Sequence, residues 1–228
     1  MRVITYLSPS IPAALFERIA RHIGAELMFE EAISGPQPGD DEPFTRGDAD
    51  VGFVCAPSYR VLRDSVELLP VLVPSDPRAK GRPVYFADVV VRRESKIESF
   101  DELRGMRWAY NDRNSRSGWF SMLERAGSAS FFGGLIHAGS HLRSLELVSS
   151  GAADAAAIDS NVLALHPRSE LRVVESWGPF PIQPAIIRRS LPDDEKRRIT
   201  DALLSIKREE LEPFGFTSFA IISETAYL

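Results

Sequence analysis

The sequence predicts an α/β fold of two lobes joined by a hinge of two crossings. Strand-like and helix-like segments alternate along most of the 228 residues, which favours sheets with largely parallel strands. Segments rich in proline or glycine near 74–84 and 176–184 interrupt this alternation and are typical of crossings. Because the C-terminal helix should return to the first lobe, we expect lobe 1 to combine residues 1–80 with 184–228, and lobe 2 to span 81–183.

The first lobe is expected to begin with a strand and a helix. RVITYL indicates a strand at 2–7, and Pro12 starts a helix with helical apolar spacing that Gly24 ends. The later segments predict, in chain order, a strand at 25–32, a loop at 34–43, a strand at 48–55, a short helix with Pro57 near its start, and an extended element at 66–73.

The second lobe is expected to open with the β-branched strand YFADVVVRRE at 85–94. SFDE has the pattern of a capping box between Ser99 and Glu102, before a helix that ends at Gly105. The segments that follow predict a strand at 106–112, a helix at about 117–126, an apolar piece at 131–139, a helix between Ser140 and Gly151, and a strand at 153–159. Beyond the second crossing, Pro192 and an acidic first turn predict a long amphipathic helix over 190–211.

The totals exclude several classes of function. A net charge of −5 without a long basic run argues against duplex nucleic acid as the main partner. It does not exclude an anionic ligand, because a small site sets its own local field. A single cysteine, Cys55, excludes an internal disulfide framework and is expected to be a buried thiol. The four histidines show no metal-ligand spacing, so we expect neither a metal site nor a cofactor.

The N-terminus bears on localisation. MRVITYL enters a strand directly, without the basic and apolar regions of a leader peptide. No stretch approaches the roughly 20 apolar residues of a membrane span. Two localisations stay open: periplasmic, if a leader was removed or is missing from this sequence, and otherwise cytoplasmic.

The stretch NDRNSRSGWF, at 111–120, predicts an anion site where a strand turns into a helix. Open α/β sheets bind ligands at such turns, and the first helical N–H groups lack intrahelical partners. The hydroxyls of Ser115 and Ser117 add donors, Gly118 allows close approach, and Arg116 offers a bidentate contact. The simpler alternative is that Asn114 or Ser115 only caps the helix.

Two further strand ends carry polar residues. His141 follows the apolar strand at the start of a helix and can donate to an anion, so we expect its loss to weaken binding more at acidic than at alkaline pH. Asp159 ends the strand ADAAAID and suits a ligand that carries a proton or an ammonium. Tyr85 and Tyr59 are candidate walls of the site. The alternatives are a polar cap for His141, a turn for Asp159 and core packing for both tyrosines.

The combination of NSRSG, AGSH, GAAD and AAID over residues 85–160 resembles the phosphate- and phosphonate-binding components of ABC transporters. The resemblance implies the type 2 periplasmic-binding-protein fold of two Rossmann-like lobes. It also implies that a phosphonate is surrounded by the residues Ser115, Arg116, Ser117, His141 and Asp159, with Tyr85 on the hinge side. A small hydroxyl residue is usual in the family at the position of Arg116, which either pairs with a more highly charged anion or turns into solvent.

We therefore predict a solute-binding protein that captures a phosphate- or phosphonate-type oxyanion in a cleft between the lobes. In a transporter, a membrane permease would recognise the closed form. One alternative is an enzyme of the same fold acting on a small anionic metabolite, although only Asp159 and His141 offer an acid–base couple and no catalytic residue is assigned. The other alternative is a cytoplasmic ligand sensor.

Overall fold

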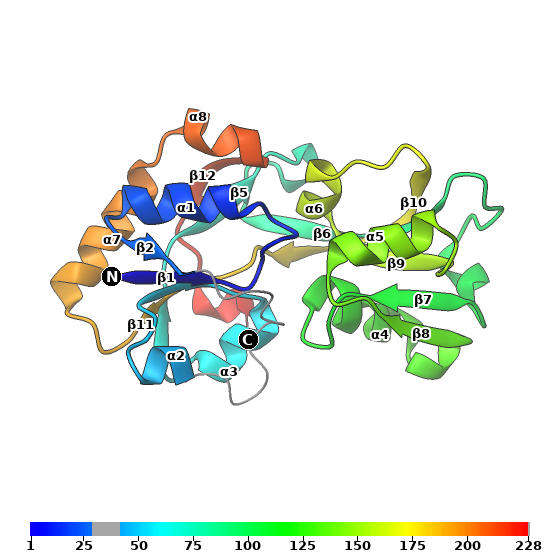
Figure 1. Ribbon diagram of the computed structural model, residues 1–228, viewed down its shortest axis with the longest axis horizontal. Helices are drawn as coiled ribbons and strands as arrows, with labels where there is room; N and C mark the ends of the chain where they lie inside the picture. The colour runs from blue at the N-terminus through cyan, green and yellow to red at the C-terminus, as the bar shows by residue number, and fades with distance from the viewer. Residues whose placement is uncertain (29–41, 228) are drawn as a thin grey trace. The chain divides into compact units, whose positions relative to one another are not determined.

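The computed structural model describes residues 1–28 and 42–227 (Figure 1). The chain divides into two compact units. The first unit combines Met1–Val84 with Pro181–Leu228, and the second is Tyr85–Phe180. Most of the loop predicted at 34–43, and the end of the strand predicted at 25–32, lie outside the described residues.

The first unit contains a mixed sheet of five strands in the order β2-β1-β3-β11-β4. Strand β1 pairs in parallel with β2 and β3, whereas β11 runs antiparallel to β3 and β4. A two-stranded antiparallel sheet joins β5 to β12. The predicted extended element at 66–73 is thus two strands that belong to different sheets. The bounds are Arg2–Thr5 for β1, Glu26–Leu27 for β2, Val51–Phe53 for β3, Val66–Leu68 for β4, Val71–Pro74 for β5, Ala185–Arg188 for β11 and Phe216–Ala220 for β12.

Helix α1, Ala13–His22, begins directly after Pro12 and ends before Gly24, as its proline and glycine predict. Helix α7, Asp193–Ser205, starts after Pro192 with three acidic residues in its first turn. The long helix predicted over 190–211 is interrupted at Ile206. Among the described residues, the other helices of this unit are α2 (Glu42–Thr45), α3 (Ala56–Leu62), α8 (Arg208–Leu211) and the 3₁₀ turns η1 (Pro77–Ala79), η5 (Glu212–Phe214) and η6 (Glu224–Tyr227).

The second unit contains one sheet of five strands in the order β10-β6-β9-β7-β8. Strand β7 pairs in parallel with both β8 and β9, while β6 runs antiparallel to β9. The carboxyl ends of β7, β8 and β9 therefore lie at one edge of the sheet (Figure 1). The bounds are Val84–Arg92 for β6, Arg107–Tyr110 for β7, Gly134–His137 for β8, Ala155–Asp159 for β9 and Leu171–Pro181 for β10.

A helical segment follows each of the three parallel strands. After β7 comes a π-helical turn η3, Arg116–Phe120, which continues into α4, Ser121–Ala126. After β8 comes α5, His141–Ser149, and after β9 comes α6, Ser160–Leu165. Two 3₁₀ turns, η2 (Phe100–Leu103) and η4 (Ala129–Phe131), complete this unit.

The capping box predicted at 99–102 is wrong in detail. The Ser99 side chain accepts no backbone hydrogen bond and instead donates its hydroxyl to Glu102, at 2.9 Å. Glu102 accepts from the amide of Glu98 at 3.4 Å, not from that of Ser99. The segment is a 3₁₀ turn of 4 residues, which is too short for an α-helical first turn to offer the amide that a capping box needs.

An aromatic cluster forms the core of the second unit. The Phe100 ring stacks on Phe131 with centroids 5.1 Å apart, and Trp108 lies 4.8 Å from Phe132. Phe100 and Trp108 have no exposed surface. This core fixes β7 in place, and with it the turn that carries the candidate site.

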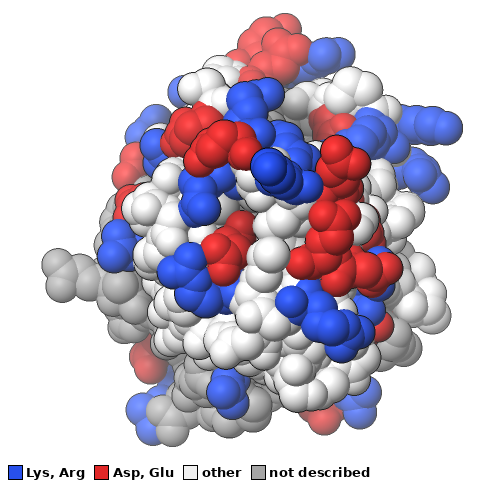
Figure 2. Space-filling model, turned by 90° about the vertical axis from the view of Figure 1, so that its right-hand side faces the viewer, with Lys and Arg blue, Asp and Glu red and all other residues white. Residues whose placement is uncertain are grey.

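Charged side chains of both signs are interleaved on the face shown in Figure 2. The second unit carries ion pairs of this kind: Arg125 lies 3.1 Å from Asp101 and 2.8 Å from Glu175, and Arg107 lies 2.8 Å from Asp154. Among the described residues, no helix is long and apolar enough to cross a bilayer.

Candidate oxyanion-binding site

Buried polar side chains gather where the three parallel strands of the second unit end. The set comprises Ser115, Ser117, Ser121, His141, Ser144, Asp159, Ser160 and Asn161, each less than 9% exposed. Polar groups are buried only when hydrogen bonds compensate for lost hydration, so such a set is unusual at the edge of an apolar core. We call this set of buried polar residues, at the strand ends predicted from the sequence, the polar edge of the second unit.

Ser115 and Ser117 form the start of helix η3. Ser115 is the N-cap, and its Oγ accepts from the Gly118 amide at 3.0 Å. Ser115 therefore does cap this helix, and its predicted contact with an anion stays a prediction. The two hydroxyl oxygens lie 3.5 Å apart. The amides of Arg116 and Ser117 belong to the first turn, where a helix has no acceptor of its own, so this turn can offer donors to an anion.

Gly118 allows the Asn111 side chain to lie against the helix. A Cβ atom at position 118 would sit 1.8 Å from Asn111 Oδ1, so no other residue fits without displacement. Asn111 Oδ1 is buried and has no hydrogen-bond partner among the described residues. Asn111 is not among the residues predicted from the sequence, although it is the first residue of the same NDRNSRSGWF stretch.

His141 contacts the same turn from helix α5. Its Nε2 lies 3.1 Å from Ser117 Oγ, and the predicted cap Ser140 accepts from the Arg143 amide at 3.1 Å. Burial lowers the pKa of His141 from 6.5 to about 4. The imidazole is therefore neutral at neutral pH. The stronger effect on binding that we expect from the loss of His141 at acidic pH then lies near pH 4.

Asp159 ends β9 and caps helix α6. Its Oδ1 accepts from the Asn161 amide at 2.8 Å, so the turn alternative is correct for its local role. The next residue, Ser160, accepts from the Phe86 amide at 3.1 Å and ties this end of β9 to β6. The Nδ2 of Asn161 is buried without a partner among the described residues. Its position directly after AAIDS is the signal that could have selected Asn161.

Arg116 pairs with a carboxylate of its own chain, and its predicted contact with an anion stays a prediction. Its Nη1 and Nη2 lie 2.5 and 2.8 Å from the carboxylate oxygens of Glu124. Its guanidinium carbon also lies 4.4 Å from the ring centroid of Phe180. The side chain is paired within the protein and does not turn freely into solvent.

The remaining candidates lie in different surroundings. The Asn114 amide donates to Asp112 Oδ1 at 2.6 Å and shapes the turn before the helix. Tyr85 is 3% exposed and its ring lies 5.9 Å from Phe180. Tyr59 belongs to the core of the first unit, where its ring lies 5.5 Å from Tyr227, as the core alternative expects.

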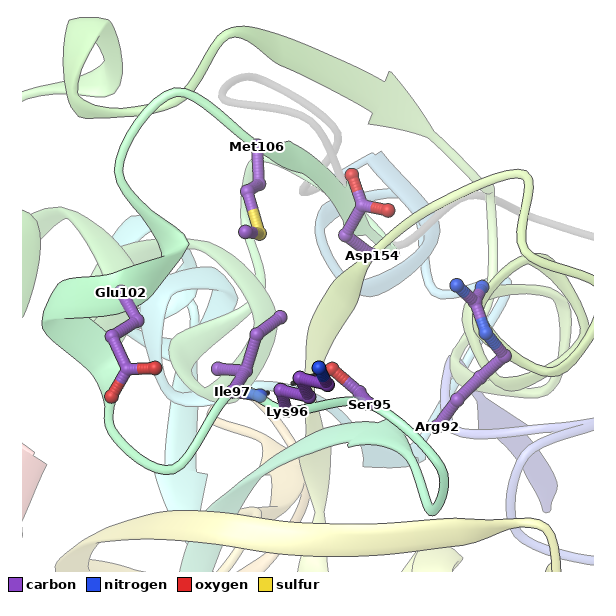
Figure 3. A pocket seen from close by; sticks show the side chains of 7 residues that line it. All are labelled: Arg92, Ser95, Lys96, Ile97, Glu102, Met106 and Asp154. Carbon is purple, nitrogen blue, oxygen red and sulfur yellow. Dashed lines mark hydrogen bonds between the residues drawn. The ribbon is translucent and has the colours of Figure 1, made fainter.

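A hollow of about 520 Å³ lies at the other end of the same sheet (Figure 3). Met106 and Asp154 precede β7 and β9, so they lie at the edge opposite to Ser117 and His141. Asp154 is paired with Arg107 and Arg92 with Glu94. Across the described residues, no group of three His, Cys, Asp or Glu could hold a metal ion.

The sequence matches the family model of the periplasmic substrate-binding proteins of phosphonate ABC transporters over residues 5–227. The chain belongs to this family. The resemblance stated from the sequence is confirmed, and the family is one of transport proteins that act in the periplasm. No protein of curated function matches this sequence.

Solved structures show the same fold. A binding protein of an ABC phosphonate transporter from Pseudomonas aeruginosa is 16% identical, with a TM-score of 0.80 over 100% of this chain and 82% of that one. PhnD1 from Prochlorococcus marinus, solved with methylphosphonate, is also 16% identical, with a TM-score of 0.80 over 100% and 94%. An ancestral arginine-binding protein has a TM-score of 0.60 at 16% identity over 94% of each chain. The predicted type 2 periplasmic-binding-protein fold is confirmed.

Proposed function

We propose that this family member binds the oxyanion of its phosphonate ligand at the polar edge of the second unit. The observation that carries the proposal is the buried contact between Ser117 Oγ and His141 Nε2, which joins the helices after β7 and β8. Around it lie the Ser115 hydroxyl and the first-turn amides of η3. These groups can donate several hydrogen bonds to the oxygens of one tetrahedral anion.

The donors proposed here are largely neutral. Burial keeps His141 uncharged at neutral pH, and the guanidinium of Arg116 is paired with Glu124. Negative charge would be stabilised by oriented N–H and O–H dipoles and by the positive ends of the helices. The carboxylate of Asp159, at the same edge, favours a ligand that carries a proton or an ammonium, because it can then accept a hydrogen bond.

Partner and location follow from the family. We propose that the protein acts in the periplasm and delivers its ligand to an ABC permease, as expected for this family. Phosphonates are the first ligand class to test, since the Prochlorococcus relative was solved with methylphosphonate. Phosphate is the second, because it presents the same tetrahedral oxygens. The closing of two lobes around the ligand stays a prediction.

An acyl-transfer enzyme would use the same two side chains differently. Ser117 and His141 have the spacing of a nucleophile and its base. In such enzymes a third group orients the imidazole through Nδ1. In the part of the chain that the structure describes, His141 Nδ1 has no hydrogen-bond partner. The arrangement therefore favours binding over nucleophilic catalysis.

Isothermal titration calorimetry with methylphosphonate, 2-aminoethylphosphonate and phosphate tests the proposal. We expect Ser115→Ala with Ser117→Ala to lower affinity by about 100-fold or more, because each hydrogen bond to a charged group contributes about 1.5–3 kcal/mol. The matched control is Ser128→Ala with Ser130→Ala, since these exposed hydroxyls have the same spacing, lie 2.9 Å apart and include a cap. Equal affinity of the two double variants would show that the anion binds elsewhere.

A further inference from the structure

Glu124 occupies the hydrogen-bonding edge of Arg116. Both carboxylate oxygens accept from the terminal guanidinium nitrogens, at 2.5 and 2.8 Å, which is the bidentate geometry that such pairs favour. The Arg116 side chain is 25% exposed and that of Glu124 is 59% exposed, so only the guanidinium is partly shielded from water. Arg116 is the first residue of η3, directly between the two serines proposed to bind the anion.

The flat face of the same guanidinium covers an aromatic ring. Its central carbon lies 4.4 Å from the centroid of Phe180, within the range of a cation–π contact. The Phe180 ring lies in turn 5.9 Å from the ring of Tyr85, at an interplanar angle of 59°. Glu124, Arg116, Phe180 and Tyr85 therefore form one continuous series of contacts.

The backbone holds Phe180 close to Tyr85. Strands β10 and β6 are neighbours in the sheet. A Cβ atom at Gly178 would lie 3.0 Å from the carbonyl oxygen of Tyr85, and the φ angle of Gly178 is +123°. Phe180 and Tyr85 are therefore held on adjacent strands, and Arg116 lies over the ring of Phe180.

We propose that Arg116 is a positioning residue that sets anion affinity through Phe180 and Tyr85, without contacting the anion. The inference rests on the proposed function and adds Tyr85 to its site, because the amide of the next residue, Phe86, donates to Ser160 at the polar edge. Glu124 holds the guanidinium in place, the guanidinium holds the Phe180 ring, and the ring fixes Tyr85. A chain with arginine at this position would then use it as a support beside the anion-binding serines.

The direction in which Glu124→Gln changes anion affinity separates this role from direct anion contact. If Arg116 bound the anion, Glu124→Gln would release the guanidinium and would raise affinity or leave it unchanged. As a positioning residue, Arg116 loses its support when Glu124 becomes glutamine, so affinity falls. Arg116→Gln lowers affinity under both roles and cannot decide between them alone.

The experiment is a double-mutant cycle measured by calorimetry with methylphosphonate and with phosphate. We expect Arg116→Gln and Glu124→Gln each to lower affinity about three- to tenfold. The double variant should lose no more affinity than the single variant with the larger loss, because the two side chains act as one unit. Arg116→Lys should recover only part of the loss, since an ammonium lacks both the fork and the flat face. In a Phe180→Leu background, Arg116→Gln should have no further effect.

Arg125→Gln is the matched control. Arg125 also pairs with a carboxylate, at 2.8 Å from Glu175, and its guanidinium lies 4.6 Å over the ring of Phe100, in the same unit. It should leave affinity unchanged. Affinity that rises or holds in Glu124→Gln, or that falls equally in Arg125→Gln, would overturn the positioning role. If Ser115→Ala with Ser117→Ala loses affinity in the same series, the proposed function stands independently of this result.

Discussion

Ser117 and His141 lie 24 residues apart in the chain, yet the hydroxyl oxygen of one is 3.1 Å from Nε2 of the other. The contact arises because β7 and β8 are parallel neighbours, so the turns that follow them meet at one edge of the sheet. His141 is 7% exposed, and this position explains its low pKa. The pH dependence of stability follows from this burial.

The first prediction concerns stability at acidic pH. The folded protein holds His141 with a pKa of about 4, below its ordinary value of 6.5, so the unfolded chain binds a proton more readily between these values. Stability is therefore complete above about pH 6.5 and falls as the pH drops towards 4. Between about pH 7.5 and 4.5, the free energy of unfolding should fall by roughly 2–3 kcal/mol less in His141→Gln than in the wild type. Urea unfolding at each pH measures this difference.

The slope of the unfolding free energy against pH is the readout that decides this prediction. Parallel pH curves for the wild type and His141→Gln would contradict the burial argument. The comparison uses slopes, so any constant loss of stability from removing the imidazole cancels.

The second prediction concerns Gly118. Alanine at this position brings its Cβ to 1.8 Å from Asn111 Oδ1, so the asparagine must leave its place. We expect Gly118→Ala to destabilise the protein by about 1–3 kcal/mol, as overpacking typically does, and to weaken phosphonate binding. Asn111→Ala in the same chain removes the clash and should restore most of the stability. Thermal unfolding and calorimetry measure the two effects.

Gly134→Ala is the matched control for Gly118→Ala. A Cβ atom at Gly134 meets only Arg107 Cγ, at an ordinary 3.7 Å, so we expect an effect within about 0.5 kcal/mol. If Gly118→Ala were as mild as Gly134→Ala, the close packing of Asn111 on the helix start would be in doubt.

The third prediction concerns an ion pair in the first unit. Asp50 is 9% exposed; it accepts from Arg188 at 2.6 Å and from the Arg2 amide at 2.9 Å. Burial raises the pKa of its carboxyl, but these hydrogen bonds outweigh burial and lower the pKa below 3.8. The stability that Asp50 contributes is thus complete above the ordinary value and is lost as the pH falls through the lower folded value.

Asp50→Ala should cost about 3–5 kcal/mol at neutral pH, because it leaves the partly buried Arg188 without its carboxylate. Asp76→Ala is the comparison: Asp76 pairs with Arg78 at 2.7 Å, two residues away and at a more exposed site, and should cost less. Urea unfolding at neutral pH measures both. Equal costs would mean that burial adds nothing to the Asp50 pair.

The strand ends and the fold were predictable from local patterns. Three polar segments each follow an apolar strand, and parallel strands place such ends together, so Ser115, Ser117, His141 and Asp159 could be selected without coordinates. Ser140 and Pro192 likewise mark the starts of α5 and α7. These features depend on capping and strand order, which the sequence carries locally.

Side-chain contacts that depend on packing could not be predicted in the same way. Arg116 and Glu124 are 8 residues apart, a spacing that no regular α-helix would favour for a pair, and the π-helical turn between them has no clear sequence signal. The burial of His141 depends on side chains from other segments, and so its low pKa emerges only from the fold. The capping box at Ser99 failed because its helix is a short 3₁₀ turn.

The last prediction concerns Asp159, which combines a cap and a proposed ligand contact. Asparagine is as good an N-cap as aspartate, and its Oδ1 can accept from the Asn161 amide in the same way, so Asp159→Asn should change stability by less than about 0.5 kcal/mol. Removing the charge should nevertheless lower the affinity for 2-aminoethylphosphonate by about tenfold or more, because a carboxylate accepts a hydrogen bond from an ammonium more strongly than an amide oxygen does.

Two comparisons make the Asp159 result decisive. Asp159→Ala removes both functions, so it should lose affinity and, with the cap, about 1 kcal/mol of stability. Methylphosphonate has no ammonium, so Asp159→Asn should lower the affinity for methylphosphonate less than the affinity for 2-aminoethylphosphonate at the same pH. Calorimetry with both ligands and urea unfolding of both variants separate the roles. If Asp159→Asn bound both ligands as the wild type does, Asp159 would be a cap alone, and the ligand contact would have to come from another residue at the polar edge. The side-chain Nδ2 of Asn161, which has no partner among the described residues, would be the first to examine.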